Sequence, residues 1–484
     1  MAPFFFLLLS VGLAASTAGW ARPAPAGNVW LTRGPGIEAH NSPTVVQNPT
    51  DPRNLVVVER IDRPRFSAAL HSSLDGGQTW QTRDFPVPSG EDRPYAPDLA
   101  FSEDGTLYLE FVTLEGRGNS PGAVWLARSS DGGVTFSKPN QVLGPHAFQV
   151  RLSVDAQRSP DRLWLTWLQA DAEAVHCQNC FNRSGLPILA AHSDDGGQSW
   201  SEAVRVSHPE RARVGAPVPV VDSDGRLLVL YYDFKGDRID WENLEGRYAG
   251  RFELVLARSR GTSAFSESVV NDDIVPPDRF LPYIPPFPSL ALSGDTAYAG
   301  WHDNRNGDWD VFLARSRDGG VTWSSPVRVN DDPAGNGRHQ YLPTVAATAA
   351  RTDIAFYDRR GDPNNIMTEL YLTYSEDEGE TFAPNVRVSS QGFSSRVGPE
   401  HIGTGGDFGS RVGLISAENR ALPVWTDTRN GTVATARQDI YGSVVTDLPG
   451  ESSDLLVPAV GLVAGVVAGV GGTLLIAARR RRVP

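Results

Sequence analysis

A short peptide that recurs along the chain constrains its fold more than any other feature. The pattern is Ser-x-Asp-x-Gly-x-Thr/Ser-Trp/Phe. Its five copies begin at Ser73, Ser129, Ser193, Ser316 and Ser375. A degenerate copy that lacks the Asp occupies residues 259–265, and with it the starting serines are 56, 64, 66, 57 and 59 residues apart. A nearly fixed period of this size predicts an array of one repeated supersecondary unit.

The residue types of the repeat favour a tight turn. Short Ser and Asp side chains bond nearby backbone amides, and glycine supplies the positive φ that other residues resist. The closing Trp or Phe can bury its ring beneath a hairpin. We therefore interpret the aspartate of each copy as structural rather than catalytic. These residues are Asp75, Asp131, Asp195, Asp318 and Asp377.

The composition agrees with a turn-rich all-β protein. The 484 residues include 48 Gly and 36 Pro, and 21% of the residues are charged. This profile is typical of a globular chain rather than a disordered one. The formal net charge of −13 argues against nucleic acid as a partner, because binding to a phosphate backbone needs an excess of cations.

Each repeat has room for four short antiparallel strands, which is the blade of a β-propeller. In residues 288–330, apolar segments at 289–292, 297–301, 311–315 and 327–330 predict strands a to d, from the axis outward. Equivalent a strands are predicted at 43–46, 97–101, 152–155, 217–222, 288–292, 343–347 and 408–415.

These seven starts favour seven blades, with six as the alternative. The last repeat has no outer strand of its own, and residues 29–32 have the expected sequence for it. The N-terminal strand would then close the ring against the C-terminal repeat and leave no open sheet edge. We assign the propeller to residues 28–447.

The repeated peptide resembles the Asp box, or BNR repeat, of the sialidase superfamily, and the resemblance covers roughly residues 29–445. It implies a β-propeller and an exo-glycosidase that removes sialic acid. Such enzymes hold the sugar carboxylate with three arginines, use a Tyr–Glu pair as nucleophile and an Asp as acid/base, and have six blades. The first of these arginines belongs to a Phe/Tyr-Arg-Ile-Pro motif, whose place here reads His40-Asn41-Ser42-Pro43 without the Arg.

Antiparallel strands place the a–b and c–d turns at one end of the ring and the b–c and d–a loops at the other. The repeated turns are c–d turns, so we expect a ligand site at the opposite end. The second strands of several blades end there in an aromatic residue, an Asp and an Arg. Together with two residues of a d–a loop, the predicted ligand-binding residues are Trp301, Arg305, Arg338, Tyr341, Tyr357, Arg360, Trp425, Asp427 and Arg429.

Two interpretations of these residues stay open. Aromatic faces stack on sugar rings, while Asp and Arg bind hydroxyls and carboxylates. Alternatively, the Asp of each blade forms an ion pair with the Arg of the same blade across the loop, and the pair stabilises the fold. A glycosidase would need two carboxylates about 5 to 9.5 Å apart. The candidates for that role are Asp62, Asp92, Asp303 and Asp358.

We predict no cofactor and no metal site, although the paired aspartates at 272–273 and 331–332 could bind Ca²⁺ through their oxygens. Cys177 and Cys180 are the only cysteines, and a small disulfide is the simplest interpretation, with half of a metal site as the alternative.

The two ends of the chain predict export and a membrane anchor. Residues 1–21 read as a signal peptide. After a linker at 448–454, residues 455–478 are uncharged and mostly apolar, long enough for a transmembrane helix, and an Arg-rich cytoplasmic tail follows at 479–484. The sequence thus favours a single-pass membrane protein whose propeller recognises an extracellular glycan, glycoprotein or protein. The alternative is a sialidase-like exo-glycosidase.

Overall fold

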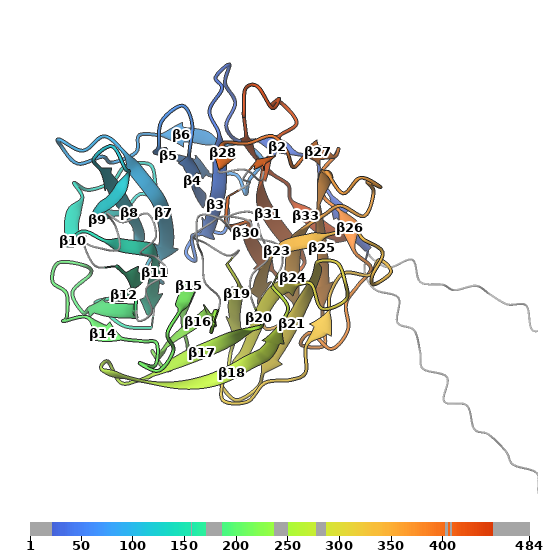
Figure 1. Ribbon diagram of the computed structural model, residues 1–484. Helices are drawn as coiled ribbons and strands as arrows, with labels where there is room; N and C mark the ends of the chain where they lie inside the picture. The colour runs from blue at the N-terminus through green and yellow to red at the C-terminus, as the bar shows by residue number, and fades with distance from the viewer. Residues whose placement is uncertain are drawn as a thin grey trace, which may run out of the picture. The chain divides into compact units, whose positions relative to one another are not determined.

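Alternating apolar residues in each repeat pair into a small antiparallel sheet. The computed structural model describes residues 22–155, 157–170, 186–236, 250–276, 287–401, 405–406 and 409–448. Residues 21–449 form one unit. Its sheets are arranged radially around an axis, and the chain passes once around the ring from blue to red (Figure 1). The structure confirms an all-β propeller of seven blades.

The first four blades each contain four strands in sequence order. Blade 1 contains β3 (His40–Gln47), β4 (Leu55–Ile61), β5 (Ser67–Ser73) and β6 (Gln81–Arg83); blade 2 contains β7 (Pro94–Phe101), β8 (Leu107–Glu115), β9 (Ser120–Ser129) and β10 (Asn140–Leu143). Blade 3 contains β11 (Ala147–Asp155), β12 (Arg162–Gln169), β13 (Ile188–Ser193) and β14 (Val204–Arg205); blade 4 contains β15 (Val214–Val221), β16 (Leu227–Asp233), β17 (Phe252–Arg260) and β18 (Ala264–Ile274).

The last three blades include the additional strands. Blade 5 contains β19 (Ser289–Ser293), β20 (Thr296–Asp303), β21 (Asp310–Ser316) and β22 (Val327–Arg328); blade 6 contains β23 (Gln340–Ala347), β24 (Thr352–Asp358), β25 (Met367–Ser375) and β26 (Val386–Arg387), with β27 (Phe393–Ser394) beside β25. Blade 7 contains β30 (Gly413–Ala417), β31 (Arg420–Asp427) and β32 (Asp439–Gly442). A two-stranded hairpin of β28 (Glu400–His401) and β29 (Gly405–Gly406) precedes blade 7.

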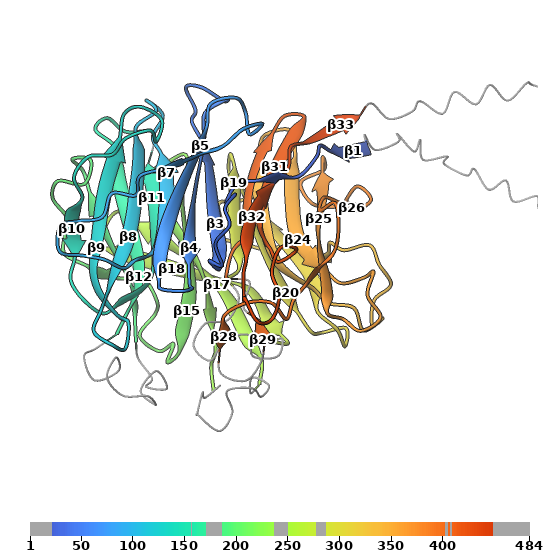
Figure 2. The same ribbon diagram turned by 90° about the horizontal axis from the view of Figure 1, so that it is seen from above.

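The N-terminal strand closes the ring, as predicted. β2 (Val29–Trp30) pairs antiparallel with β32 and is the outer strand of blade 7. A second pairing was not predicted: β1 (Arg22–Pro25) pairs with β33 (Val445–Leu448), and β33 also pairs with β31. The described chain therefore begins and ends on neighbouring strands, at the dark blue and red segments of Figure 2.

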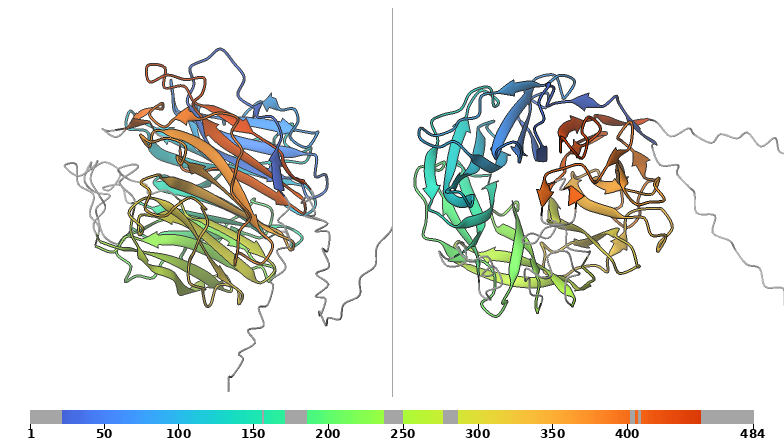
Figure 3. Two further views of the ribbon diagram at one scale, coloured as in Figure 1. Left: turned by 90° about the vertical axis from the view of Figure 1, so that its right-hand side faces the viewer. Right: turned by 45° about the horizontal axis from the view of Figure 1, so that its top comes forward.

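Apolar side chains pack between the faces of adjacent blades. Val56 and Val58 of β4, for example, share a buried cluster with Leu107, Leu109 and Phe111 of β8. Burying an aliphatic or aromatic side chain of this size stabilises the fold by about 1.5–3 kcal/mol. Each blade is therefore stabilised by its two neighbours around the closed ring (Figure 3).

The repeated peptide forms the turn between the third and fourth strands in blades 1, 2, 3, 5 and 6. In blade 1, the Asp75 Oδ1 accepts hydrogen bonds from the amides of Gln78 and Thr79 at 3.0 and 2.9 Å, and its Oδ2 accepts the Thr79 hydroxyl at 2.6 Å. Slight burial acts to raise the Asp75 pKa, but these hydrogen bonds lower it to about 2. The carboxylate is therefore occupied by its own turn.

Several predictions fall outside the described residues. These are the signal peptide, most of the linker, the membrane anchor at 455–478, the Arg-rich tail and the Cys177–Cys180 disulfide. Within the described ranges no helix has the length and apolar character needed to span a membrane.

Candidate functional site

In five of the seven blades the strand at the axis contains a bulge, which redirects one side chain toward the axis. In blades 1, 2, 3, 4 and 6 the register between the first two strands shifts by this bulge. The shift follows a single residue in the left-handed region of φ. Those residues are Ser42, Ala96, Gln149, Ala216 and Leu342, with φ of 55°, 49°, 55°, 57° and 51°. A bulge of this kind bends a strand and redirects the residues after it.

The position two residues after each left-handed residue faces the axis and is polar in most blades. With the equivalent residues of blades 5 and 7 it reads Thr44, Asp98, Arg151, Val218, Ser289, Thr344 and Arg411. Several of these side chains bond the next inner strand: the Thr344 hydroxyl donates to the carbonyl of Val412 at 2.7 Å, and the Ser289 hydroxyl accepts from the amide of Val345 at 2.9 Å. In most blades this position therefore fastens neighbouring strands together.

Asp98, Arg151 and Arg411 form a charged cluster at the same level, which we call the axial cluster. The Arg151 Nε lies 3.1 Å from Asp98 Oδ2, and the Arg411 Nη1 lies 3.6 Å from Asp98 Oδ1. Arg411 also donates from Nη2 to the carbonyl of Pro97 at 3.1 Å. Burial and the neighbouring guanidinium of Arg151 lower the pKa of Arg411 to about 9. One carboxylate thus faces two guanidiniums, whose side chains are 18% and 13% exposed.

Glu110 lies beside this cluster and does not balance it. It is paired with Asp98 across β7 and β8, which places the two Cβ atoms about 5 Å apart. The Glu110 side chain is fully buried, and neither carboxylate oxygen has a hydrogen-bond partner among the described residues. Burial, together with the charge of Asp98, raises the pKa of Glu110 well above its usual value. Burial therefore favours the protonated, uncharged form of Glu110.

A cavity of about 220 Å³ lies along the axis next to the cluster, and we call it the axial pocket. Arg151 and Arg411 line it together with inner-strand residues of blades 1, 4, 5, 6 and 7. Thr44, Thr344 and Ser289 add hydroxyls, while Leu342 and Val345 add apolar surface. Polar and apolar groups thus line the cavity together, and convergent polar groups are a feature of small-molecule sites.

The aromatic residues predicted to stack on a ligand lie inside the blades. Trp301, Tyr357 and Trp425 are 0% exposed, and Tyr341 is 1% exposed. Their faces contact neighbouring side chains of the core: Trp301 stacks on Phe312, for example, with ring centroids 6.0 Å apart. Burial of these rings favours the architectural interpretation over direct contact with a sugar.

The predicted Asp and Arg residues pair within their own blades. Arg305 donates from Nε to Asp303 at 2.9 Å, and Arg360 donates from Nε to Asp358 at 2.7 Å. Arg429 donates from Nη2 to Asp427 at 2.6 Å.

Each of these guanidiniums also lies over an aromatic ring of the adjacent strand. The rings are Phe312, Tyr371 and Tyr441, at 4.5, 4.4 and 4.2 Å from the guanidinium carbon. Burial raises the pKa of Asp358 to about 6 and also raises that of Asp427, although the paired arginines act against both shifts. Each Asp–Arg pair, with its aromatic ring, thus closes the b–c loop of its own blade.

The remaining candidates are scattered. Asp62 is buried and accepts hydrogen bonds from Arg60 Nη2 at 2.8 Å and Asn41 Nδ2 at 2.9 Å. Asp92 is exposed and pairs with Arg65 at 3.1 Å. Arg338 donates to the carbonyl of Pro363 at 2.6 Å. No hydrogen bond or ion pair among the described residues joins any two of the four predicted catalytic aspartates.

The axial cluster was missed at the sequence level, although a signal for it exists. Aligning the blades on their inner strands puts Asp98, Arg151 and Arg411 in a column otherwise occupied by Thr, Ser and Val. A charge in a column of small residues marks a departure from the repeat, and function concentrates at such departures. For metals, no group of three or more His, Cys, Asp or Glu placed to hold an ion is found among the described residues.

Comparisons with known proteins leave the activity of the chain open. No family model matches the chain. A xyloglucanase of Paenibacillus sp is 24% identical over 301 residues, which cover 58% of this chain and 25% of that protein. The match therefore spans about a quarter of the length of this relative.

Among solved structures, a Dyadobacter fermentans protein of unknown function has 13% identity and a TM-score of 0.47, covering 88% of this chain and 99% of that one. The endosialidase of phage phi92 has 11% identity and a TM-score of 0.46, covering 92% and 71%. A Fusarium graminearum GH93 α-L-arabinofuranosidase has 13% identity and a TM-score of 0.44, covering 87% and 98%. Similarity at this level assigns no activity to this chain, since one fold hosts many functions.

Proposed function

We propose that the protein binds the terminal acidic sugar of an extracellular glycan in the axial pocket. The charge balance of the axial cluster carries this proposal. Arg151 and Arg411 supply two guanidiniums against the one carboxylate of Asp98, and burial favours the uncharged form of Glu110, so positive charge is in excess in the cluster. An excess charge that is largely shielded from water is costly without a partner. A sugar carboxylate is the counterion that this pocket lacks, and arginine binds carboxylates bidentately.

The size of the axial pocket supports a single sugar unit. Its volume of about 220 Å³ is below the range of roughly 300–1,000 Å³ for drug-sized ligands. A chain terminus would enter it, whereas the interior of a polysaccharide would not. The hydroxyls of Thr44, Ser289 and Thr344 offer partners for the sugar hydroxyls.

Binding of the full-length protein to a glycan array tests the proposal. We expect binding to glycans that end in sialic or uronic acids, and weaker binding to neutral counterparts. Arg151→Gln should weaken the acidic ligands about 10- to 100-fold, because a charged hydrogen bond contributes about 1.5–3 kcal/mol. Arg53→Gln, at an exposed ion pair with Asp51, is the matched control and should bind normally. Equal binding of neutral and acidic termini, or an unaffected Arg151→Gln protein, would contradict the proposal.

A second candidate function is exo-glycosidase activity at the same pocket. The observation that favours it is the neighbouring pair of Asp98, which lies against Arg151, and Glu110, whose pKa is raised. The full burial of Glu110 favours binding over hydrolysis, since an acid must reach the leaving group. Turnover of aryl glycosides of sialic or uronic acids that is lost in Glu110→Gln, with binding retained, would establish this second function.

We also propose that the five repeated turns are Asp boxes of the sialidase superfamily. Support comes from their uniform hydrogen bonding, in which each Ser hydroxyl donates to the Asp and accepts an amide four residues on.

The exported, membrane-anchored location also remains our proposal. It rests on residues 1–21 and 455–484. Protease digestion of intact cells should remove the propeller, and protection of the propeller would contradict this location.

A further inference from the structure

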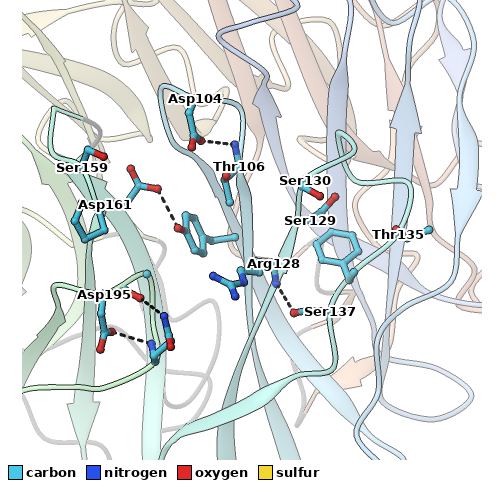
Figure 4. Close-up of a pocket in the computed structure, with 15 residues that line it drawn as sticks. Asp104, Thr106, Arg128, Ser129, Ser130, Thr135, Ser137, Ser159, Asp161 and Asp195 are labelled. Carbon is cyan, nitrogen blue, oxygen red and sulfur yellow. Dashed lines mark hydrogen bonds between the residues drawn. The ribbon is translucent and has the colours of Figure 1, made fainter.

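A second pocket lies between blades 2 and 3, at the end of the ring that carries the repeated turns. Its volume is about 760 Å³, and we call it the interblade pocket. Blade 2 contributes the first turn of its sheet and the flanks of its repeated turn, and blade 3 contributes the facing turns (Figure 4). It shares no lining residue with the axial pocket.

Arg128 makes the gap between blades 2 and 3 different from the gaps that follow blades 4 and 5. Arginine occupies the same place, just before the first Ser of the turn, in blades 2, 4 and 5. Arg258 of blade 4 donates from Nη1 to the carbonyl of Gly319 at 3.1 Å, and Arg315 of blade 5 donates from Nη1 to the carbonyl of Glu378 at 3.1 Å. Both acceptors lie at the same position in the turn of the next blade. These two arginines therefore join adjacent blades.

Arg128 does not make the equivalent bond. The matching residue of the next blade is Gly196, where an added Cβ would lie 3.9 Å from the Arg128 Nη1. The guanidinium of Arg128 forms no hydrogen bond or ion pair with any described residue, and the side chain is exposed and lines the pocket. Figure 4 shows Arg128 among the pocket residues, between Asp161 and Ser137. Its five donors are available to a ligand.

The carboxylates of the interblade pocket already accept hydrogen bonds from protein groups. Asp161 accepts the hydroxyl of the buried Tyr108 at 2.9 Å. Asp104 accepts the amide of Thr106 at 2.8 Å, and Asp195 accepts the hydroxyl of Ser199. Three carboxylates against one guanidinium disfavour an anionic ligand, and no group of three or more His, Cys, Asp or Glu side chains in the described part of the chain is placed to hold a metal ion. The mixture suits a neutral molecule rich in hydroxyls.

We propose that the interblade pocket is a second binding site, which takes a neutral oligosaccharide. Arg128 donates to hydroxyl or ring oxygens of the sugar, and the remaining lone pairs of Asp161 accept from sugar hydroxyls. The half-buried ring of Phe136 packs against the apolar face of a sugar ring. A volume of about 760 Å³ lies within the range of roughly 300–1,000 Å³ typical of ligand sites and has room for more than one sugar unit.

Calorimetric titration of the full-length protein with a panel of oligosaccharides tests this site. The neutral probes are xyloglucan, cello- and arabino-oligosaccharides, and the acidic probes are sialyllactose and oligogalacturonate. We expect at least one neutral oligosaccharide to bind. Its Kd should rise at least tenfold in Arg128→Ala, and its binding should be lost in Ser130→Trp, which fills the pocket from an exposed position.

Arg258→Ala is the matched control, because it removes an arginine that joins blades rather than one that faces a pocket. It should lower the unfolding temperature and leave binding unchanged, whereas Arg128→Ala should leave the unfolding temperature unchanged. Absence of binding by any neutral probe, or neutral binding that is indifferent to both pocket variants, overturns the proposal. So does an effect of the pocket variants on acidic probes alone. Arg151→Gln acts on the axial pocket and should not affect the neutral probes, so the two sites can fail separately.

Discussion

Buried ionisable side chains in blade 1 are held by partners on neighbouring strands. Glu59 of β4 is 0% exposed and contacts His40 Nδ1 of β3 at 2.8 Å and His71 Nε2 of β5 at 3.0 Å. Burial is the largest single effect and lowers the pKa of His40, but the charge and the hydrogen bond of Glu59, together with more distant carboxylates, outweigh it and the net shift is upward. Asp439 and Glu38 act in the same direction. The His40–Glu59 pair therefore stabilises the folded state when His40 is protonated.

This pair predicts a stability that depends on pH. Because the folded pKa of His40 lies above its unfolded value near 6.5, the contribution is complete below about pH 6.5 and is lost as the pH rises through the folded pKa. In that window the unfolding free energy should fall by up to about 1.4 kcal/mol per pH unit. Urea unfolding of wild type and His40→Gln between pH 5.5 and 9 measures the effect. Their difference should shrink toward high pH, and a constant difference would exclude this role.

Among individual residues, the sequence predicted the aspartates of the repeated turns better than the residues of the axial cluster. Asp75 and its equivalents carry a motif whose hydrogen bonds are local, so the sequence contains all of their partners. Asp98, Arg151 and Arg411 come from three blades and meet only in the folded ring, where bulges redirect the inner strands that carry Asp98 and Arg151. No local pattern encodes a contact between residues 98 and 411.

Among the elements, the repeated turn and the inner strand matter most. The c–d turns lie where the motif predicts them, and the degenerate copy forms a plain hairpin between β17 and β18. The inner strands of blades 1, 2, 4 and 6 begin three residues before the prediction. A left-handed residue followed by proline reads as a strand boundary, but here the strand continues across it as a bulge. The sequence cannot separate the two cases without the partner strand.

Removing the aspartate from a turn should weaken its blade. Asp318 accepts hydrogen bonds from the amides of Val321 and Thr322 and from the Thr322 hydroxyl. By analogy with a helix cap, Asp318→Ala should lower the unfolding free energy by about 0.5–2 kcal/mol. Ser263→Ala, an exposed position in the degenerate hairpin, should change it by less than about 0.5 kcal/mol. Chemical denaturation measures the unfolding free energy of both variants. Equal losses would mean that the aspartate does not stabilise the turn.

The whole molecule depends on closure of the ring. β2 pairs with β32 across more than 400 residues, and Leu31 beside it is 5% exposed within a cluster shared by blades 7 and 1. The Thr32 hydroxyl adds a buried bond to Asp439 at 3.1 Å. Closure in this way removes the open sheet edge that blade 7 would otherwise expose.

Shortening one buried side chain beside β2 should destabilise the whole ring. Leu31→Ala removes buried surface and leaves a cavity, so the unfolding free energy should fall by about 2–5 kcal/mol. Leu74→Ala removes the same atoms from a side chain that is 56% exposed, and should cost less than about 0.5 kcal/mol. Thermal unfolding followed by circular dichroism distinguishes them. A Leu31→Ala protein as stable as Leu74→Ala would show that the N-terminal strand is dispensable.

The most direct test of the axial pocket as a sugar site is a crystal structure of the protein with an acidic monosaccharide. We predict that the sugar lies in the axial pocket with its carboxylate within hydrogen-bond distance of Arg151 and Arg411. A sugar bound only elsewhere on the propeller, with the axial pocket holding solvent at saturating ligand, would contradict the account.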